Sequence, residues 1–363
     1  MDRRTFLKLA MAGVAAGATQ GIFALDALAK TKDTQPWFMQ GAPQYTMSDA
    51  HFHFVDFLQH SDGMDALLQA MNANGVQHIM LSGMPLVKKW DKDDPAAPKY
   101  YLDNTSRAYW YSGTDYRVAH AVLRLPEELR YRFHPYICGF NGTDKYAVEH
   151  VQRMLDEFPG LWQGIGEIFG HRDDLTNMTY GENARANHPA LDPVYDLAAR
   201  LDMPVNLHNN CTSRVQTKEL RYVYEVEGAL KNHPKTRIVW AHAGLSRYME
   251  DIDQRAYTEM LRGMLDTYKN LWLDLSWLVY ENYVTDGMPQ LVVHPYWLQL
   301  VEDFPDRFMV GSDSIGHMGT YALNIRKYYT LFRALPKDAA QKVARDNFLS
   351  ILPQKVRETL PQK

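Results

Sequence analysis

The feature that most limits the fold is a regular alternation of short apolar runs with longer amphipathic segments. Each apolar run is nearly continuous, which is typical of parallel strands that are covered on both faces. Eight runs are strand candidates, at residues 45–54, 76–82, 133–140, 162–170, 204–210, 237–244, 271–277 and 307–314. Helical periodicity occurs at residues 64–74, 144–158, 189–201, 218–232, 246–268, 289–304, 321–334 and 337–350.

This alternation predicts an α/β protein, a single-domain (β/α)8 TIM barrel. A length of 363 residues is normal for a barrel, although it is long for most other single cores. An open, doubly wound parallel sheet is the alternative. It has less support because no G-x-G-x-x-G motif follows the first strand candidate.

One interval breaks the alternation. Residues 86–132 form an insertion after the second strand candidate, with a helix-like piece only near 117–130. Because the connection after a barrel strand starts at its carboxyl end, this insertion borders the barrel mouth. We expect a lid or pocket wall, or else a separate hydrophobic cluster or a subunit contact in a homo-oligomer. Its aromatic residues are Trp90, Tyr100, Tyr101, Tyr109, Trp110 and Tyr111.

Residues 1–29 have the pattern of an export signal. Arg3 and Arg4 precede the letters TFLK, an Ala- and Gly-rich run follows, and the segment ends in an A-x-A cleavage pattern at 27–29. This resembles a twin-arginine signal, which implies the twin-arginine export machinery as a partner and a bacterial periplasmic location. A membrane anchor is the alternative, but so much Ala and Gly makes a poor spanning helix. We therefore expect residues 30–363 to form the barrel, without a stable membrane span.

Charge limits the class of ligand. The formal net charge is −4, and no block of basic residues occurs in the chain. Nucleic-acid binding requires an electropositive surface for the phosphates, so this composition argues against it. We expect a small-molecule substrate.

The stretch SDAHFHFVDF, residues 48–57, contains the first part of a candidate site. His51 and His53 are two residues apart in a strand candidate, so their side chains point to the same face. Position 53 lies near the carboxyl end of this strand, where barrel active sites are built. A core strand gains nothing from two imidazoles unless something binds them.

Three further residues stand where other strand candidates end. His208 follows PVNL, His242 follows IVWA, and Asp313 follows FMVGS. We expect these side chains to converge with the first pair on one rim of the barrel. Imidazole and carboxylate ligands suit Zn2+ and similar divalent ions. The sequence thus predicts a divalent metal ion, most simply Zn2+, with Mn2+ as an alternative. By contrast, His78 and His134 fall at the beginnings of strand candidates.

Five segments, taken in order, resemble the amidohydrolase superfamily of metal-dependent barrels. They extend over residues 45–315, and the resemblance is closest to the amidohydrolase-2-like branch of decarboxylases, lactonases and single-metal hydrolases. The segments are D-A-H-F-H (49–53), G-I-G-E (164–167), L-H (207–208), A-H-A-G (241–244) and G-S-D (311–313).

The resemblance implies a role for each matching residue. Asp313 would act as a ligand, as the general base, or as both. His242 would polarise the substrate or transfer a proton, or else bind a second metal. Glu167 would either bridge two metals or orient a ligand histidine. The metal ligands that the resemblance implies are His51, His53, His208 and Asp313.

The resemblance also implies a metal-dependent hydrolase, in which metal-activated water attacks an amide, ester or lactone carbonyl of a small molecule. Non-oxidative decarboxylation of a small aromatic or unsaturated carboxylic acid is the first alternative. In that reaction Arg172 and Arg214, just beyond the fourth and fifth strand candidates, would hold the carboxylate. Trp277 and Asp274, at the end of the seventh, would line the pocket. A non-catalytic periplasmic metal-binding barrel is the second alternative.

Overall fold

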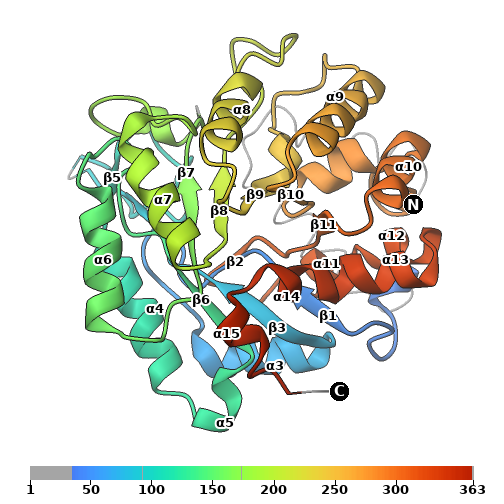
Figure 1. Ribbon diagram of the computed structural model, residues 1–363, viewed down its shortest axis with the longest axis horizontal. Helices are drawn as coiled ribbons and strands as arrows, with labels where there is room; N and C mark the ends of the chain where they lie inside the picture. The colour runs from blue at the N-terminus through green and yellow to red at the C-terminus, as the bar shows by residue number, and fades with distance from the viewer. Residues whose placement is uncertain (1–34, 92, 173, 362–363) are drawn as a thin grey trace.

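The structure is a computed structural model that describes residues 35–91, 93–172 and 174–361 (Figure 1). The export signal predicted at residues 1–29 lies outside the described residues. Both the signal and the periplasmic location therefore stay predictions. Within the described residues, no helix is both long enough and apolar enough to cross a membrane.

Eight parallel strands form a curled sheet at the centre of the molecule (Figure 1). The strand order is β1-β3-β6-β7-β8-β9-β10-β11, so neighbours in the sheet follow one another along the chain. One of these strands lies within each of the eight predicted segments. The strands are β1 (Met47–Asp49), β3 (Val76–Leu81), β6 (Phe133–Ile137), β7 (Gly164–Phe169), β8 (Val205–His208), β9 (Ile238–Trp240), β10 (Leu271–Asp274) and β11 (Phe308–Met309).

The first and last parts of the sheet also meet. β2 (Phe52–His53) continues the first strand and pairs in parallel with β12 (Ser314–Ile315), which continues the last. The backbone N–H of Asp313 donates to the carbonyl of His51 at 2.8 Å. The predicted (β/α)8 barrel is therefore confirmed.

Helices surround the sheet (Figure 1). Those before residue 304 lie in the connections between successive strands of the barrel, and those after residue 320 follow β12. They are α3 (Gly63–Ala73), α4 (Gly113–Leu123), α5 (Glu127–Arg130), α6 (Ala147–Glu157), α7 (Asp192–Arg200), α8 (Val223–Asn232), α9 (Gln254–Thr267), α10 (Pro295–Asp303), α11 (Tyr321–Arg326), α12 (Tyr329–Ala334), α13 (Lys337–Gln341), α14 (Asn347–Ile351) and α15 (Gln354–Arg357).

Apolar side chains fill the core in two places. A large cluster lies between the strands and the surrounding helices. A smaller one contains Met80, Tyr136 and Met309 from the strands, together with Phe348 and Ile351 from α14. The helix α14 therefore packs on barrel residues, as expected for a filled barrel and not a pore.

The predicted insertion, residues 86–132, consists of different parts. β4 (Leu86–Lys88) pairs with β5 (Ala108–Trp110) as an antiparallel hairpin, and α4 and α5 follow. Because α4 is the helix that links β3 to β6, the irregular part ends at residue 112. Tyr101 is completely buried and Tyr100 is partly buried, whereas Trp90, Tyr109 and Tyr111 are exposed.

Candidate metal centre

The structure brings together the residues that the sequence singled out as metal ligands. Each comes from the carboxyl end of a strand or from the turn directly after it, as the barrel geometry predicts. The side chains of the four histidines and of Glu167 are at most 2% exposed, and that of Asp313 is 12% exposed. The converging residues are His51 and His53 at β2, Glu167 in β7, His208 at the end of β8, His242 after β9, and Asp313 between β11 and β12.

His51, His53 and Asp313 form a first donor group. The Nε2 atoms of both histidines lie 3.6 Å from Asp313 Oδ1. Glu167 borders the same group, because its Oε2 lies 3.1 Å from His53 Nε2 and its Oε1 lies 3.4 Å from His51 Nε2. In this group the candidate ligand atoms are close enough to share one cation.

Glu167, His208 and His242 form a second donor group. Glu167 Oε1 lies 2.8 Å from His208 Nδ1 and 3.6 Å from His242 Nε2. The two histidine nitrogens are 3.2 Å apart. Glu167 thus faces both groups, which is the position required of a carboxylate that bridges two cations.

Each histidine is held by a partner on the side away from these groups. A ring N–H that donates outward leaves the other nitrogen without a proton, and this nitrogen faces the centre. Although His51 Nε2 is buried, it forms no hydrogen bond in the structure. This donor set fits a divalent cation. The outward partners are Asp274 for His51 (3.1 Å), the Gly83 carbonyl for His53 (2.7 Å), Asn210 for His208 (2.9 Å) and Ser276 for His242 (2.8 Å).

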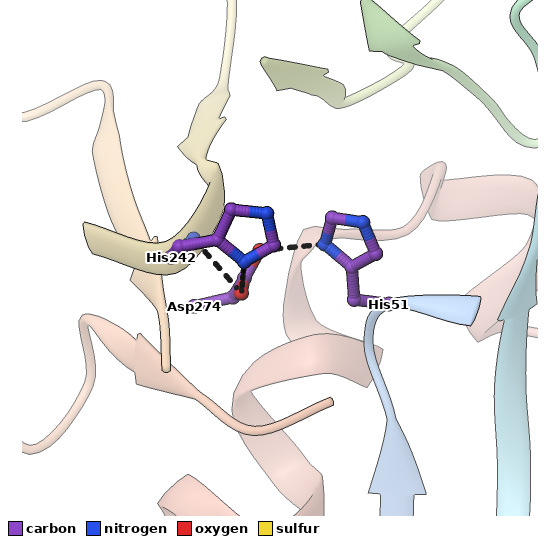
Figure 2. A group of neighbouring side chains, drawn as sticks. All are labelled: His51, His242 and Asp274. Atoms are coloured by element: carbon purple, nitrogen blue, oxygen red, sulfur yellow. Dashed lines mark hydrogen bonds and ion pairs between the residues drawn. The ribbon is translucent and has the colours of Figure 1, made fainter. Parts of the chain in front are cut away.

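Asp274 lies between two of the histidines (Figure 2). Its Oδ2 accepts from His51 Nδ1, and its Oδ1 accepts from the backbone N–H of His242 at 3.1 Å and from the Ser276 hydroxyl. Sequence reasoning placed Asp274 only in the pocket lining. Its contacts instead make it a residue that positions His51 and the turn that carries His242.

The charges at this centre are those that metal binding requires. Burial raises the pKa of Asp274, but His51 and the hydrogen bonds lower it to about 2. Burial also raises the pKa of Glu167, yet His51 and His208 hold it well below its usual value. Burial lowers the pKa of His208 to about 4. Ionised carboxylates and neutral imidazoles are the forms that bind cations.

His51 behaves differently from His208. Burial lowers its pKa, but Glu167 and Asp274 raise it well above the usual value. A proton on His51 and a divalent cation at the centre are both stabilised by the same carboxylate, Glu167. Protons and cations therefore compete for this position.

Several site residues have a backbone conformation that L residues rarely adopt. The φ angles are 57° at His242, 74° at Trp277 and 47° at Asp313. Such strain clusters at functional sites, where the surrounding structure holds it. Close packing adds a further constraint, because a Cβ at Gly311 would lie 2.6 Å from the Cβ of His51.

The predicted substrate-binding residues have different positions. The Trp277 ring lies 5.0 Å from the His242 ring, and the Arg172 guanidinium lies 5.1 Å from the centroid of the Trp277 ring. Arg214 is exposed on a tight turn that the Ser213–Gln216 bridge closes, and its role toward a substrate carboxylate stays a prediction. Arg247, which sequence reasoning missed, stacks on Trp277 at 4.7 Å.

The sequence matches a known family. Residues 164–350 match the model of the amidohydrolase family, which is just over half of the 363 residues. The chain therefore belongs to the amidohydrolase family of enzymes, as the five segments predicted. Among curated proteins, no sequence matches.

Solved structures share the fold. A probable 2-pyrone-4,6-dicarboxylic acid hydrolase from Acinetobacter baumannii, with citric acid bound, is 13% identical with a TM-score of 0.54, covering 85% of this chain and 99% of its own. An amidohydrolase from Burkholderia multivorans with bound zinc is 13% identical with a TM-score of 0.53, and its coverage is the same. A dihydroorotase from Campylobacter jejuni is 16% identical with a TM-score of 0.51, covering 88% of this chain and 84% of its own. Identities this low show the shared fold alone.

Proposed function

We propose that this amidohydrolase is a divalent-metal-dependent hydrolase that cleaves an amide, ester or lactone of a small molecule. The observation that carries the proposal is the buried centre, in which four histidines and two carboxylates converge. Each histidine is also fixed by an outward hydrogen bond. The zinc in the Burkholderia multivorans amidohydrolase and the hydrolase from Acinetobacter baumannii support the same chemistry.

We further propose two cation positions, one in each donor group. Glu167 faces both groups with its two carboxylate oxygens, so it would be the ligand that the two positions share. His242 would then help to hold the second cation, in place of its predicted role toward the substrate. Zn2+ is the expected ion because the ligands are nitrogen and carboxylate oxygen, and Mn2+ is the alternative.

The described residues divide the chemical work. A divalent cation, when bound, supplies the Lewis acidity that polarises a carbonyl and lowers the pKa of water. Asp313 is the most exposed carboxylate of the centre, so it is best placed to take the proton of the attacking water and to return it to the leaving group. Asp274 keeps the Nε2 of His51 directed to the centre. Trp277 and Phe169 pack near the histidine rings and exclude water from that side.

Non-oxidative decarboxylation is the second candidate, and one observation favours it. Two arginines stack on Trp277 beside the centre, where they can hold an acid substrate. In this reaction Asp313 would deliver a proton to the carbon atom that loses CO2. The two reactions differ in whether water becomes part of the product.

A single set of reactions distinguishes these functions. The purified protein is incubated with ester, amide and lactone substrates and with aromatic acids, in water enriched in oxygen-18. A hydrolase incorporates oxygen-18 into the product carboxylate, whereas a decarboxylase releases CO2 and incorporates a solvent proton into the product. Bound metal without turnover of either panel would instead favour the non-catalytic metal-binding barrel and contradict the proposal.

We also propose that the twin-arginine machinery exports the chain to the periplasm. The motif at Arg3 and Arg4 supports this, since such signals serve proteins that fold before transport. Cell fractionation of the wild type and of an Arg3→Lys/Arg4→Lys variant tests it. Export should depend on the two arginines, and equal export of both proteins would contradict the proposal.

A further inference from the structure

Trp277 lies beside the metal centre on a turn with an unusual backbone. The turn follows β10, and the Trp277 ring lies 5.0 Å from the His242 ring and 6.1 Å from the His208 ring. The φ angle of Trp277 is 74°, in the left-handed region that residues with a Cβ rarely adopt. Such a conformation persists only where contacts from the surrounding structure hold it. The position of the ring therefore depends on what its backbone binds.

Lys327 provides a contact that holds this turn. It directly follows α11, is 1% exposed, and its Nζ donates to the carbonyl of Trp277 at 2.7 Å. The same Nζ lies 3.1 Å and 3.0 Å from the two carboxylate oxygens of Glu281. Glu281 belongs to the π-helical turn η6 (Tyr280–Val284), which follows Trp277 in the chain. The three N–H groups of the ammonium thus have three acceptors, all on one short segment.

The next residue supports the same part of the barrel. The Tyr328 hydroxyl lies 2.7 Å from the carbonyl oxygen of Leu275 and 2.9 Å from that of Gly311, and it donates its proton to one of them. Leu275 is the first residue after β10, and Gly311 is the second after β11. Lys327 and Tyr328 therefore contact the ends of two neighbouring strands from one stretch between α11 and α12.

The ion pair of Lys327 and Glu281 is a weak source of stability. Removing an ammonium and a carboxylate from water costs free energy that their attraction hardly returns, so apolar side chains of similar size are often at least as stabilising. Apolar side chains, however, cannot donate to the buried Trp277 carbonyl, which needs a hydrogen-bond partner. The role of the pair is therefore directional, because Glu281 fixes the ammonium and the ammonium fixes the turn.

We propose that Lys327, held by Glu281, is a positioning residue that keeps the Trp277 ring against the second donor group. A fixed ring gives the pocket a rigid wall beside His208 and His242, so a bound small molecule is directed toward the donor groups. The consequence for turnover rests on the proposed function. The position of the ring does not, since it can be measured without any substrate.

The test follows the Trp277 ring by fluorine-19 NMR in the purified protein, with all eight tryptophans replaced by 5-fluorotryptophan. Trp277→Phe identifies its resonance, and Co2+ loaded in place of Zn2+ is a paramagnetic ion that shifts the resonances of nearby rings. In the wild type, Trp277 should give one narrow resonance with a large Co2+-induced shift. In Lys327→Met/Glu281→Met this shift should fall by roughly half or more, because a ring released to other rotamers moves away from the centre.

Two further measurements separate positioning from a structural role. The double variant contains neither charge of the pair, so its free energy of unfolding, measured with denaturant, should equal or exceed that of the wild type. Lys342→Met is the matched control, since it breaks a partly exposed ion pair with Asp306. This control should leave the Co2+-induced shift of Trp277 unchanged.

An unchanged Co2+-induced shift in the double variant would overturn the inference, and so would an equal loss of the shift in Lys342→Met. If the double variant does not fold, Glu281→Gln replaces it, because Glu281 is 20% exposed and the change keeps its volume. The shift should then fall by less, and no fall would overturn the inference.

A wild type that binds no Co2+ would count against the proposed function alone. The metal-free proteins then decide the position of the ring. One narrow Trp277 resonance in the wild type that becomes broad or multiple in the double variant would support the inference. The same narrow resonance in both proteins would overturn it.

Discussion

The two ends of the barrel each contain buried histidines, yet only one end has the donor arrangement that a metal ion requires. At the carboxyl end, four imidazoles converge with two carboxylates between them. At the amino end, His78 and His134 lie close together in β3 and β6, with Nδ1 of the first 3.1 Å from Nε2 of the second. Of the described residues, no carboxylate forms an ion pair with either ring at this end.

The amino-end pair is a neutral hydrogen-bonded part of the core. His134 binds the Gln163 side chain at 2.6 Å, and its ring packs on Phe348 of α14. Burial lowers the pKa of His78 to about 4 and that of His134 to about 3. The nearby charge of Arg345 contributes to the lowered pKa of His78.

The difference shows what distinguishes a metal site from a polar core. Burial is common to both ends, so it cannot be the deciding property. The carboxyl end adds carboxylates between the rings and gives each ring an outward partner, which leaves one nitrogen directed to the centre. The amino end has one ring bound to the other, which uses the nitrogens that a metal would need.

The largest expected effect is the loss of metal in His53→Ala. This change removes a ligand from the first donor group, so metal affinity should fall by at least about a hundredfold and turnover should be lost. Mass-spectrometric metal analysis and a turnover assay measure both. His78→Ala is the matched control at the amino end and should retain its metal. Equal metal content in the two variants would contradict the proposed difference between the two ends of the barrel.

Glu167→Gln sharpens the same comparison within the carboxyl end. A neutral amide cannot bridge two cations as a carboxylate does, so the amount of metal per chain should fall by about half. Titration of the demetallated variant with Zn2+ measures the number of sites. Unchanged stoichiometry would show that Glu167 does not join the two donor groups.

Asp274→Asn should have a smaller effect, because Asp274 acts through His51. Loss of such a partner typically lowers metal affinity by roughly 10–100-fold. Competition with a chelator measures the affinity. Gln163→Ala removes the corresponding partner of His134 at the amino end and should leave metal affinity unchanged. If both variants bind metal with the affinity of the wild type, the hydrogen bond from Asp274 to His51 does not contribute to metal binding.

The smallest expected effect is on stability at low pH. The folded protein keeps His78 and His134 neutral at pH values where the unfolded chain, with a pKa near 6.5, takes up protons. The unfolded state therefore gains protons as the pH falls from 6.5 toward 4, and this pair lowers the free energy of unfolding over that range. Denaturant unfolding across this range measures the slope.

A His78→Gln/His134→Gln variant has no titrating group at these positions. Its stability should change less between pH 6.5 and pH 4 than that of the wild type, when both proteins are compared without metal. An identical slope would mean that other groups control the acid response of the barrel.

The sequence predicted the strands and the convergence of the candidate ligands because both follow from the positions of strand ends. His208, His242 and Asp313 were recognisable since each one follows an apolar run. The carboxyl ends of the parallel strands lie on the same rim of the barrel, whatever the conformations of the loops. The outward partner Asp274 also ends a strand, but nothing in the sequence shows which ring it contacts.

Loop residues were not predictable in the same way. The periodicity suggested a helix over 246–268, which would have placed Arg247 on the outer surface. The helix α9 instead begins at Gln254, where the Asp253 side chain caps it, and Arg247 lies in a loop that reaches Trp277. Arg214 lies exposed on a tight turn, which the sequence did not predict either. The position of Tyr101 depends on the path of the long connection after β3, and helix and strand propensities do not determine that path.

The most direct measurement is anomalous X-ray diffraction at the zinc absorption edge, with crystals of the purified protein. The proposed metal centre predicts a peak within ligand distance of His51 and His53 and a second one beside His208 and His242, with Glu167 between them. A zinc-soaked crystal without a peak in either donor group, or with its strongest peak at the amino-end histidines, would contradict it.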